Sequence, residues 1–104
     1  MTLIEIGKKY PTSKNNSGFI ELYQKYFNHL KDKKINILEI GVYKGDSLRL
    51  WREYFTNANI CGIDLHKSDF TIDNTEILIG DQSDYSFLQT VVSKYKNFDI
   101  IIDD

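Results

Sequence analysis

Four short apolar segments of this 104-residue chain each end in residues that can bind a ligand. The first ends in Glu39 and a glycine loop over residues 41–45, the second in Asp64, the third in residues 80–82 and the fourth in residues 103–104. If the four segments are parallel strands, their carboxyl ends meet at one edge of the sheet, where such sheets bind their ligands. One acidic residue at a strand end indicates little, but four at the same edge predict a binding crevice.

Gly41 and Gly45 bracket the turn between the first predicted strand and the helix that follows it. Glycine at such a turn lets backbone N–H groups approach a ligand at the start of a helix. The spacing is G-x-x-x-G and differs from the G-x-G-x-x-G of dinucleotide-binding folds. By itself the loop is weak evidence, because a turn between any strand and helix can use glycine for purely structural reasons.

The acidic residues indicate which ligand the crevice would take. Glu39 would repel a pyrophosphate and would suit a ligand that carries an ammonium and a sulfonium group. Asp64 can accept from both hydroxyls of a ribose. Asp81 can accept from an exocyclic adenine amine while the backbone of Gln82 meets a ring nitrogen. The alternative for Asp64 and Asp81 is turn formation or helix capping, and it is a serious one for Asp81 because a helix starts nearby.

Two histidines accompany these residues. His66 follows Asp64 closely enough to line the same crevice, but we favour the interpretation of a loop histidine without function. His29 has no obvious partner, so we assign it no role.

The pattern of apolar residues predicts strands and helices that alternate after residue 34. The predicted strands cover residues 35–40, 58–63, 76–79 and 98–102. The predicted helices between them cover residues 47–55 and 83–95. This alternation implies right-handed crossovers and a doubly wound parallel sheet, that is, an α/β fold.

Residues 1–34 are predicted to form a helical lead-in, and residues 35–104 the domain that carries the crevice. Thr2 and Glu5 have the spacing of a capping box for a short helix that ends before Pro11. Apolar residues then recur at helical spacing from Phe19 to Leu30. That stripe would suit packing on a core or a dimer interface, and its spacing fits both.

Composition excludes several classes of function. The chain has 13 basic and 15 acidic residues and a net charge of −2, which gives no argument for binding nucleic acid or an anionic membrane. Its single cysteine, Cys61, lies in an apolar run and is best explained as a small buried hydrophobe in a reducing compartment. No segment has the pattern of a signal peptide or a membrane span, so we expect a cytoplasmic protein.

The motifs resemble those of a known family. The run ILEIGVYKGDSLRLW over residues 37–51 resembles motif I of the class I S-adenosylmethionine-dependent methyltransferases, and residues 63–64, 80–82 and 98–104 follow in the expected order. The chain is similar in particular to macrolide-sugar O-methyltransferases of the mycinamicin and macrocin type and to cephalosporin-hydroxylase-like proteins. The resemblance covers nearly the whole chain. It implies a Rossmann-like sheet of strand order 3-2-1-4, truncated after the fourth strand.

The resemblance also implies roles for individual residues. The cofactor-binding residues would be Glu39, Gly41 and Gly45 for the methionine part, Asp64 for the ribose, and Asp81 and Gln82 for the adenine. Asp103 and Asp104 would be ligands of a divalent cation, Mg²⁺, which would orient a sugar hydroxyl and ease its deprotonation. The alternative for this pair is two solvated carboxylates. In the family a glycine and a histidine follow the paired aspartates, and that histidine is the candidate general base, so the catalytic residue is unknown here. Where the family has an Asp-Lys pair, this chain has Ser13 and Lys14.

The resemblance therefore implies a methyltransferase that binds S-adenosylmethionine and O-methylates a sugar or another hydroxylated small molecule. For the 104-residue chain itself we expect cofactor binding and leave catalysis open. One alternative is a non-catalytic, truncated Rossmann-like module for binding or interaction. Another is an NAD-dependent oxidoreductase, which the glycine spacing and Glu39 disfavour. The apolar fourth strand would be an exposed sheet edge, so we expect it to be covered by self-association into a homo-oligomer or by the helical lead-in.

Overall fold

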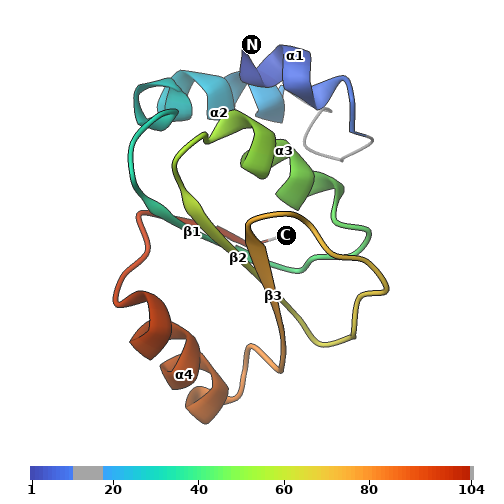
Figure 1. Cartoon of the computed structure of the whole chain (residues 1–104), viewed down its shortest axis with the longest axis vertical. Helices are drawn as coiled ribbons and strands as arrows, with labels where there is room; N and C mark the ends of the chain where they lie inside the picture. Colours follow the sequence, from blue (N-terminus) through green and yellow to red (C-terminus); the bar gives the residue numbers. More distant parts are fainter. Residues whose placement is uncertain (11–17, 104) are drawn as a thin grey trace.

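The computed structural model describes residues 1–10 and 18–103 and contains one four-stranded parallel sheet (Figure 1). The strands are β1 (Asn36–Ile40), β2 (Asn59–Asp64), β3 (Thr75–Ile79) and β4 (Ile100–Asp103). The helices are α1 (Leu3–Gly7), α2 (Phe19–Phe27), the 3₁₀ helix η2 (Asn28–Leu30), α3 (Asp46–Tyr54) and α4 (Tyr85–Tyr95). The sheet order is β3-β2-β1-β4, which confirms the predicted 3-2-1-4 topology.

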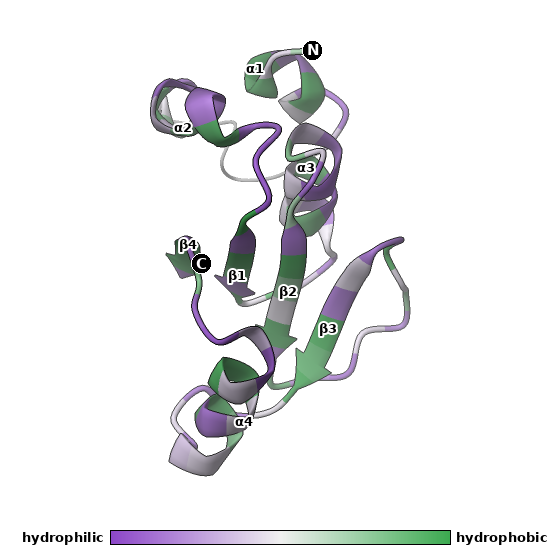
Figure 2. Ribbon diagram, turned by 60° about the vertical axis from the view of Figure 1, so that its left-hand side comes forward, coloured by the Kyte–Doolittle hydropathy of each residue, from purple (hydrophilic) through white to green (hydrophobic). Residues whose placement is uncertain are grey.

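The sheet has β1 at its centre, and each neighbour pairs with it in parallel. Ile37 of β1 lies opposite Ile60 of β2 on one side and Ile100 of β4 on the other. In Figures 1 and 2, helices α1, α2 and α3 lie together at the top of the molecule and α4 lies alone at the bottom. Because side chains alternate along a strand, each face of the sheet has its own core.

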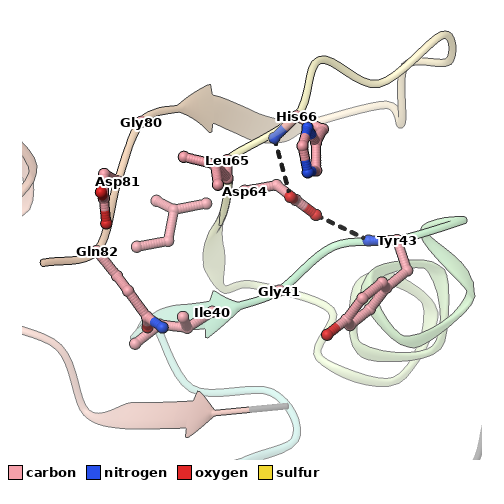
Figure 3. Close-up of a pocket in the computed structure, with 10 residues that line it drawn as sticks. Ile40, Gly41, Tyr43, Asp64, Leu65, His66, Gly80, Asp81 and Gln82 are labelled. Carbon is pink, nitrogen blue, oxygen red and sulfur yellow. Dashed lines mark hydrogen bonds between the residues drawn. The ribbon is translucent and has the colours of Figure 1, made fainter.

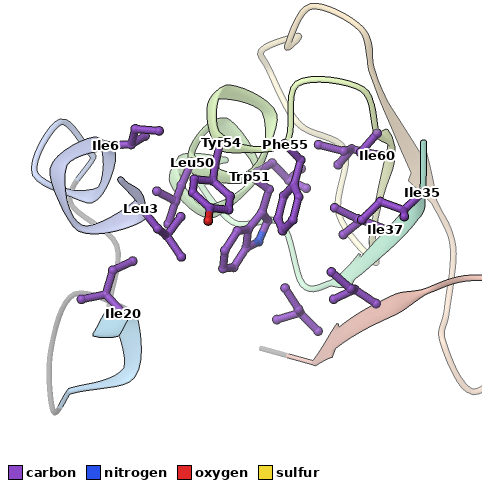
Figure 4. Close-up of a cluster of buried hydrophobic side chains, with 14 of the residues drawn as sticks. Leu3, Ile6, Ile20, Ile35, Ile37, Leu50, Trp51, Tyr54, Phe55 and Ile60 are labelled. Carbon is purple, nitrogen blue, oxygen red and sulfur yellow. The ribbon is translucent and has the colours of Figure 1, made fainter. Parts of the chain in front are cut away.

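The larger core lies under α1, α2 and α3 and is built around aromatic side chains (Figure 4). Trp51 and Tyr54 of α3, and Phe55 directly after it, are fully buried or nearly so there. They pack with aliphatic side chains from the two N-terminal helices and from the sheet, among them Leu3, Ile6, Ile20, Ile35, Ile37 and Ile60. The smaller core, under α4, consists of the buried residues Leu38, Cys61, Ile63 and Val91. The expectation that Cys61 is a buried hydrophobe is confirmed.

The N-terminal helices begin as the sequence predicts. The Oγ1 atom of Thr2 accepts from the Glu5 N–H at 3.1 Å, and Glu5 Oε1 accepts from the Thr2 N–H at 2.9 Å, which completes the capping box. The apolar stripe of α2 divides into two parts. Tyr23 and Phe27 stack on each other and contact Trp51, and Ile20 is buried beside them in the same core. Phe19, Leu22 and Tyr26 of the same helix are exposed.

Strand β4 is covered on one face. Ile100 and Ile102 are buried in the core that also holds Ile20 of α2, so the lead-in shares in covering this face. Ile101 points the other way and is 60% exposed. Self-association through this edge stays a prediction. Ser13, Lys14 and Asp104 lie outside the described residues. No helix in the described part of the chain combines the length and the apolar character that a membrane span requires.

Candidate functional site

A cavity of about 300 Å³ lies at the carboxyl ends of β1, β2 and β3 (Figure 3). It is lined by Ile40, Gly41, Tyr43, Ile63, Asp64, Leu65, His66, Gly80, Asp81 and Gln82. These residues come from three strand ends that are far apart in the sequence and adjacent in the sheet. The cavity brings together four of the six residues predicted to bind a cofactor, namely Gly41, Asp64, Asp81 and Gln82.

The carboxylate of Asp64 joins two loops at the wall of this cavity. Its Oδ2 atom accepts from the backbone N–H groups of Val42 and Tyr43 at 2.9 and 3.0 Å, and its Oδ1 atom accepts from the N–H of His66 at 3.1 Å. Partial burial raises the pKa of Asp64, but the backbone N–H donors of Tyr43, His66 and Val42 outweigh it and leave the pKa below its ordinary value. Asp64 therefore has the structural role that we left open, and it still lines the cavity.

Asp81 and Gln82 form the opposite wall. The Oδ1 atom of Asp81 accepts from the Ser83 N–H at 2.8 Å and from its hydroxyl at 2.7 Å, so Asp81 forms the turn that was the alternative to ligand binding. These hydrogen bonds from Ser83 lower the pKa of the Asp81 carboxyl. Helix capping falls to Asp84 instead, which accepts from two backbone N–H groups of α4. Gln82 extends its side chain toward Ile40, which lines the same cavity (Figure 3).

Glu39 and Gly45, the other two predicted cofactor residues, do not line this cavity. Glu39 is fully buried, and its Oε2 atom accepts from the Ser47 hydroxyl at 2.8 Å and from the Trp51 indole N–H at 2.9 Å. Strand alternation explains this orientation, because Glu39 shares the α3 face of β1 with Ile37 while Ile40 borders the cavity. Gly45 is the last residue of the glycine loop and the N-cap of α3, where it adopts a left-handed conformation with φ +83°.

The predicted metal ligands are only partly described. Asp103 ends β4, is exposed, and lies opposite Ile40 of β1 in the sheet register. Asp104 lies outside the described residues. Within the described ranges, no group of three or more His, Cys, Asp or Glu side chains is arranged to hold a metal ion. Asp103 offers one exposed carboxylate at this edge of the sheet, and its role as a metal ligand stays a prediction.

Sequence reasoning missed part of the cavity wall. Tyr43 lines it, is 70% exposed, and has a positive φ of 52°. Its position between the two loop glycines, where left-handed turns are common, was a usable signal. His66 and Leu65 also line the cavity. This position agrees with the less favoured of our two interpretations of His66, that it borders the crevice.

The fold and the crevice define a class of protein. A parallel sheet of order 3-2-1-4, a glycine turn after β1 and an acidic residue at the end of β2 form the Rossmann-like cofactor-binding architecture of class I methyltransferases.

Comparison with known proteins narrows this class. No protein-family model matches the sequence. Over 98% of its length the chain is 35% identical to mycinamicin VI 2''-O-methyltransferase of Micromonospora griseorubida and 32% identical to demethylmacrocin O-methyltransferase of Streptomyces fradiae. It is 36% identical over 83% of its length to a tetracenomycin-C rhamnosyl 3'-O-methyltransferase of Streptomyces olivaceus. The chain spans only 24 to 28% of the length of these relatives.

Solved structures agree with this relationship. The crystal structure of the MycE methyltransferase with Mg and SAH superimposes on the whole chain with a TM-score of 0.91 and 31% identity, and the chain covers 30% of it. A putative ribosomal RNA methyltransferase from Plasmodium falciparum matches 91% of the chain with a TM-score of 0.68 and 28% identity. The chain is thus homologous to one part of the S-adenosylmethionine-dependent sugar O-methyltransferases of the mycinamicin and macrocin type.

Proposed function

We propose that the cavity binds S-adenosylmethionine and that the chain is the cofactor-binding part of an O-methyltransferase acting on a sugar or a similar hydroxylated small molecule. One observation carries the proposal: Gly41, Asp64, Asp81 and Gln82, which come from three strand ends, line a single cavity. The close superposition on MycE, which was crystallised with SAH, supports it further.

In this proposal Asp64 accepts from the cofactor ribose. A carboxylate offers about four lone-pair sites, and the backbone N–H groups of Val42, Tyr43 and His66 already use three of those of Asp64. The Leu65 N–H also lowers the pKa of this carboxyl, so we propose that Asp64 accepts from at most one ribose hydroxyl and not from both. Asp81 and Gln82 on the facing wall would contact the adenine. The two carboxylates on the cavity wall, Asp64 and Asp81, favour a cationic ligand over one carrying a pyrophosphate.

For the methionine end of the cofactor, we propose that Gly41 contacts the ligand. Glu39 and Gly45 would position the glycine loop without contacting the ligand themselves. Gly41 has φ +92°, a conformation that glycine adopts without strain, and it borders the cavity. Glu39 is hydrogen-bonded to Ser47 and Trp51, so it would fix the first turns of α3 on which the glycine loop rests.

For the metal, we propose Asp103, together with Asp104, as ligands of Mg²⁺, because hard carboxylate oxygens suit this ion. Bound Mg²⁺ would polarise the acceptor hydroxyl as a Lewis acid. Exposure of Asp103 at the carboxyl end of β4 keeps its oxygens accessible for this role.

Isothermal titration of the chain with S-adenosylhomocysteine tests cofactor binding. We expect binding by the unmutated chain and weaker binding by Asp64→Asn, by roughly 10- to 100-fold, because a hydrogen bond to a charged group contributes about 1.5–3 kcal/mol. Asp69→Asn is the matched control, since Asp69 is exposed in the same β2–β3 loop and does not line the cavity. Equal affinities of the Asp64 and Asp69 variants, or no binding by the chain, would contradict the proposal.

A second assay separates an enzyme from a binding module. Methyl transfer from labelled S-adenosylmethionine to a glycoside acceptor, with and without Mg²⁺, reports turnover directly. Transfer that depends on Mg²⁺ and is lost in Asp103→Asn is the result expected for a metal-assisted methyltransferase. Cofactor binding without any transfer would support the non-catalytic alternative.

A further inference from the structure

Two of the three loops that border the cavity are joined by a contact on their far side. The first loop, residues 41–45, connects β1 to α3, and the second, residues 65–74, connects β2 to β3. On the cavity side Asp64 holds both loops through their backbone N–H groups. Away from the cavity, Arg49 of α3 and Phe70 of the second loop lie against each other, and neither residue lines the cavity.

Arg49 contacts both loops at once. Its Nη1 atom donates to the backbone carbonyl of Lys44 in the first loop at 2.8 Å. The guanidinium carbon lies 4.8 Å from the centroid of the Phe70 ring in the second loop, a cation–π distance. Asp46, one turn earlier on α3, lies 3.6 Å from the same nitrogen and favours this placement. The side chain of Arg49 is 33% exposed, so these contacts are only partly screened by water.

Gly45 completes the contact by leaving room for the Phe70 ring. A Cβ atom on Gly45 would lie 2.5 Å from the ring of Phe70, which is far inside van der Waals contact. With φ +83° the position also disfavours any side chain. The absence of a side chain at residue 45 therefore serves the packing of one loop on the other. Gly45 does not line the cavity, and this packing gives a structural reason for a glycine at that position.

We propose that Arg49 and Phe70, packed on Gly45, form a latch that positions the two loops for cofactor binding. Arg49 and Phe70 are positioning residues, because they act through the loops and not on the ligand. The proposal rests on the proposed function of the cavity. Its physical basis is preorganisation: loops already held in the binding conformation do not lose that freedom when a ligand binds.

The test compares two arginines of α3 that both bond to backbone carbonyls. Arg49→Met removes the latch and keeps the aliphatic stem. Arg52→Met is the matched control, because Arg52 donates to the carbonyls of Phe55, Ala58 and Asn74. It therefore contacts the second loop only at its last residue, Asn74, and in the described structure it does not stack on Phe70 or bond to the first loop. Hydrogen exchange in the ligand-free chain is read at the N–H groups bonded to Asp64, those of Val42, Tyr43 and His66.

We expect Arg49→Met to speed exchange at these three N–H groups about five- to tenfold, which corresponds to about 1–1.4 kcal/mol, because both a hydrogen bond and a cation–π contact are lost. The Kd for S-adenosylhomocysteine should rise about tenfold, and Arg49→Lys should recover part of the affinity. Phe70→Leu should have a smaller effect in the same direction, because it removes the cation–π contact and leaves the hydrogen bond from Arg49 to Lys44. The double variant Arg49→Met/Phe70→Leu should be no worse than the stronger single variant.

The outcomes separate the latch from the function it serves. Unchanged exchange in Arg49→Met, or equal acceleration in Arg52→Met, would overturn the latch even if the unmutated chain binds S-adenosylhomocysteine. Additive effects of the two latch substitutions would overturn it as well. Faster loop exchange in a chain that binds no S-adenosylhomocysteine would instead refute the proposed function, and with it the role of the latch in cofactor binding.

Discussion

The substitution Ser47→Ala tests whether the buried Glu39 side chain is hydrogen-bonded to α3 as in the structure. Ser47 is buried and its hydroxyl lies 2.8 Å from Glu39 Oε2. Removing this donor takes one hydrogen bond from a fully buried carboxyl oxygen, which costs about 1.5–3 kcal/mol, the upper part of the range for a buried acceptor that loses its donor. The serine-to-alanine change itself is favourable in a helix by a few tenths of a kcal/mol, so the net loss of stability should be about 1–2.5 kcal/mol.

Urea unfolding followed by tryptophan fluorescence measures this loss, since the only tryptophan, Trp51, bonds to the same oxygen. With a slope of about 1–1.5 kcal/mol per molar urea for a chain of this size, the midpoint should fall by about 1–2 M. Ser93→Ala is the control, because Ser93 is exposed within α4. If Ser47→Ala and Ser93→Ala unfold at the same urea concentration, the buried contact between Glu39 and α3 does not stabilise the fold, and our placement of this side chain is refuted.

Three further predictions follow from particular contacts. Gly80→Ala should destabilise the fold by about 1–3 kcal/mol through overpacking, since a Cβ atom at this position would lie 2.4 Å from the Phe87 ring. Thermal unfolding should show a lower melting temperature for this variant, and the double variant Gly80→Ala/Phe87→Leu should recover part of the loss. The pKa of Asp64 is lowered in the folded chain, so the stability that its ionised carboxylate contributes is fully present above the ordinary pKa of about 3.9. This stability is lost as the pH falls through the pKa of the folded chain. Carboxyl chemical shifts measured against pH should show this titration, and Asp64→Asn should remove it. Burial raises the pKa of the Cys61 thiol to about 11, so the folded chain should resist a thiol reagent at pH 8 and react once urea unfolds it; fast labelling without urea would contradict this.

Much of the fold was predictable because its elements have strong local patterns. The β-branched run that forms β1 and the capping box of Thr2 and Glu5 give the element type and start within a residue or so. Helix α4 shows the limit of such patterns. It was predicted from residue 83 but begins at Tyr85, because Asp84 accepts from the N–H groups of Ser86 and Phe87 and so defines the helix start.

The site was predictable as a set of strand ends and less so as a set of side-chain directions. Asp64 and Asp81 follow directly from the rule that parallel sheets bind ligands at their carboxyl edge. Glu39 also lies near this edge, but its side chain faces α3 and not the cavity. Two features of the sequence could have predicted this orientation. Ser47 and Trp51 are four residues apart and share one helix face, and a buried indole N–H needs an acceptor. The Arg49–Phe70 contact joins a helix to an irregular loop, and no sequence periodicity predicts such a contact.

The place of β4 beside β1 has a consequence for how the chain folds. Their register joins Ile37 to Ile100, so the central strand gains its second neighbour only after a long stretch of chain has been synthesised. Pairings between residues so distant in sequence close slowly, because a large loop must be ordered before the contact forms. Until then one side of β1 presents unpaired backbone groups, which promote intermolecular association. Refolding at high dilution should therefore give more native chain than refolding at high concentration.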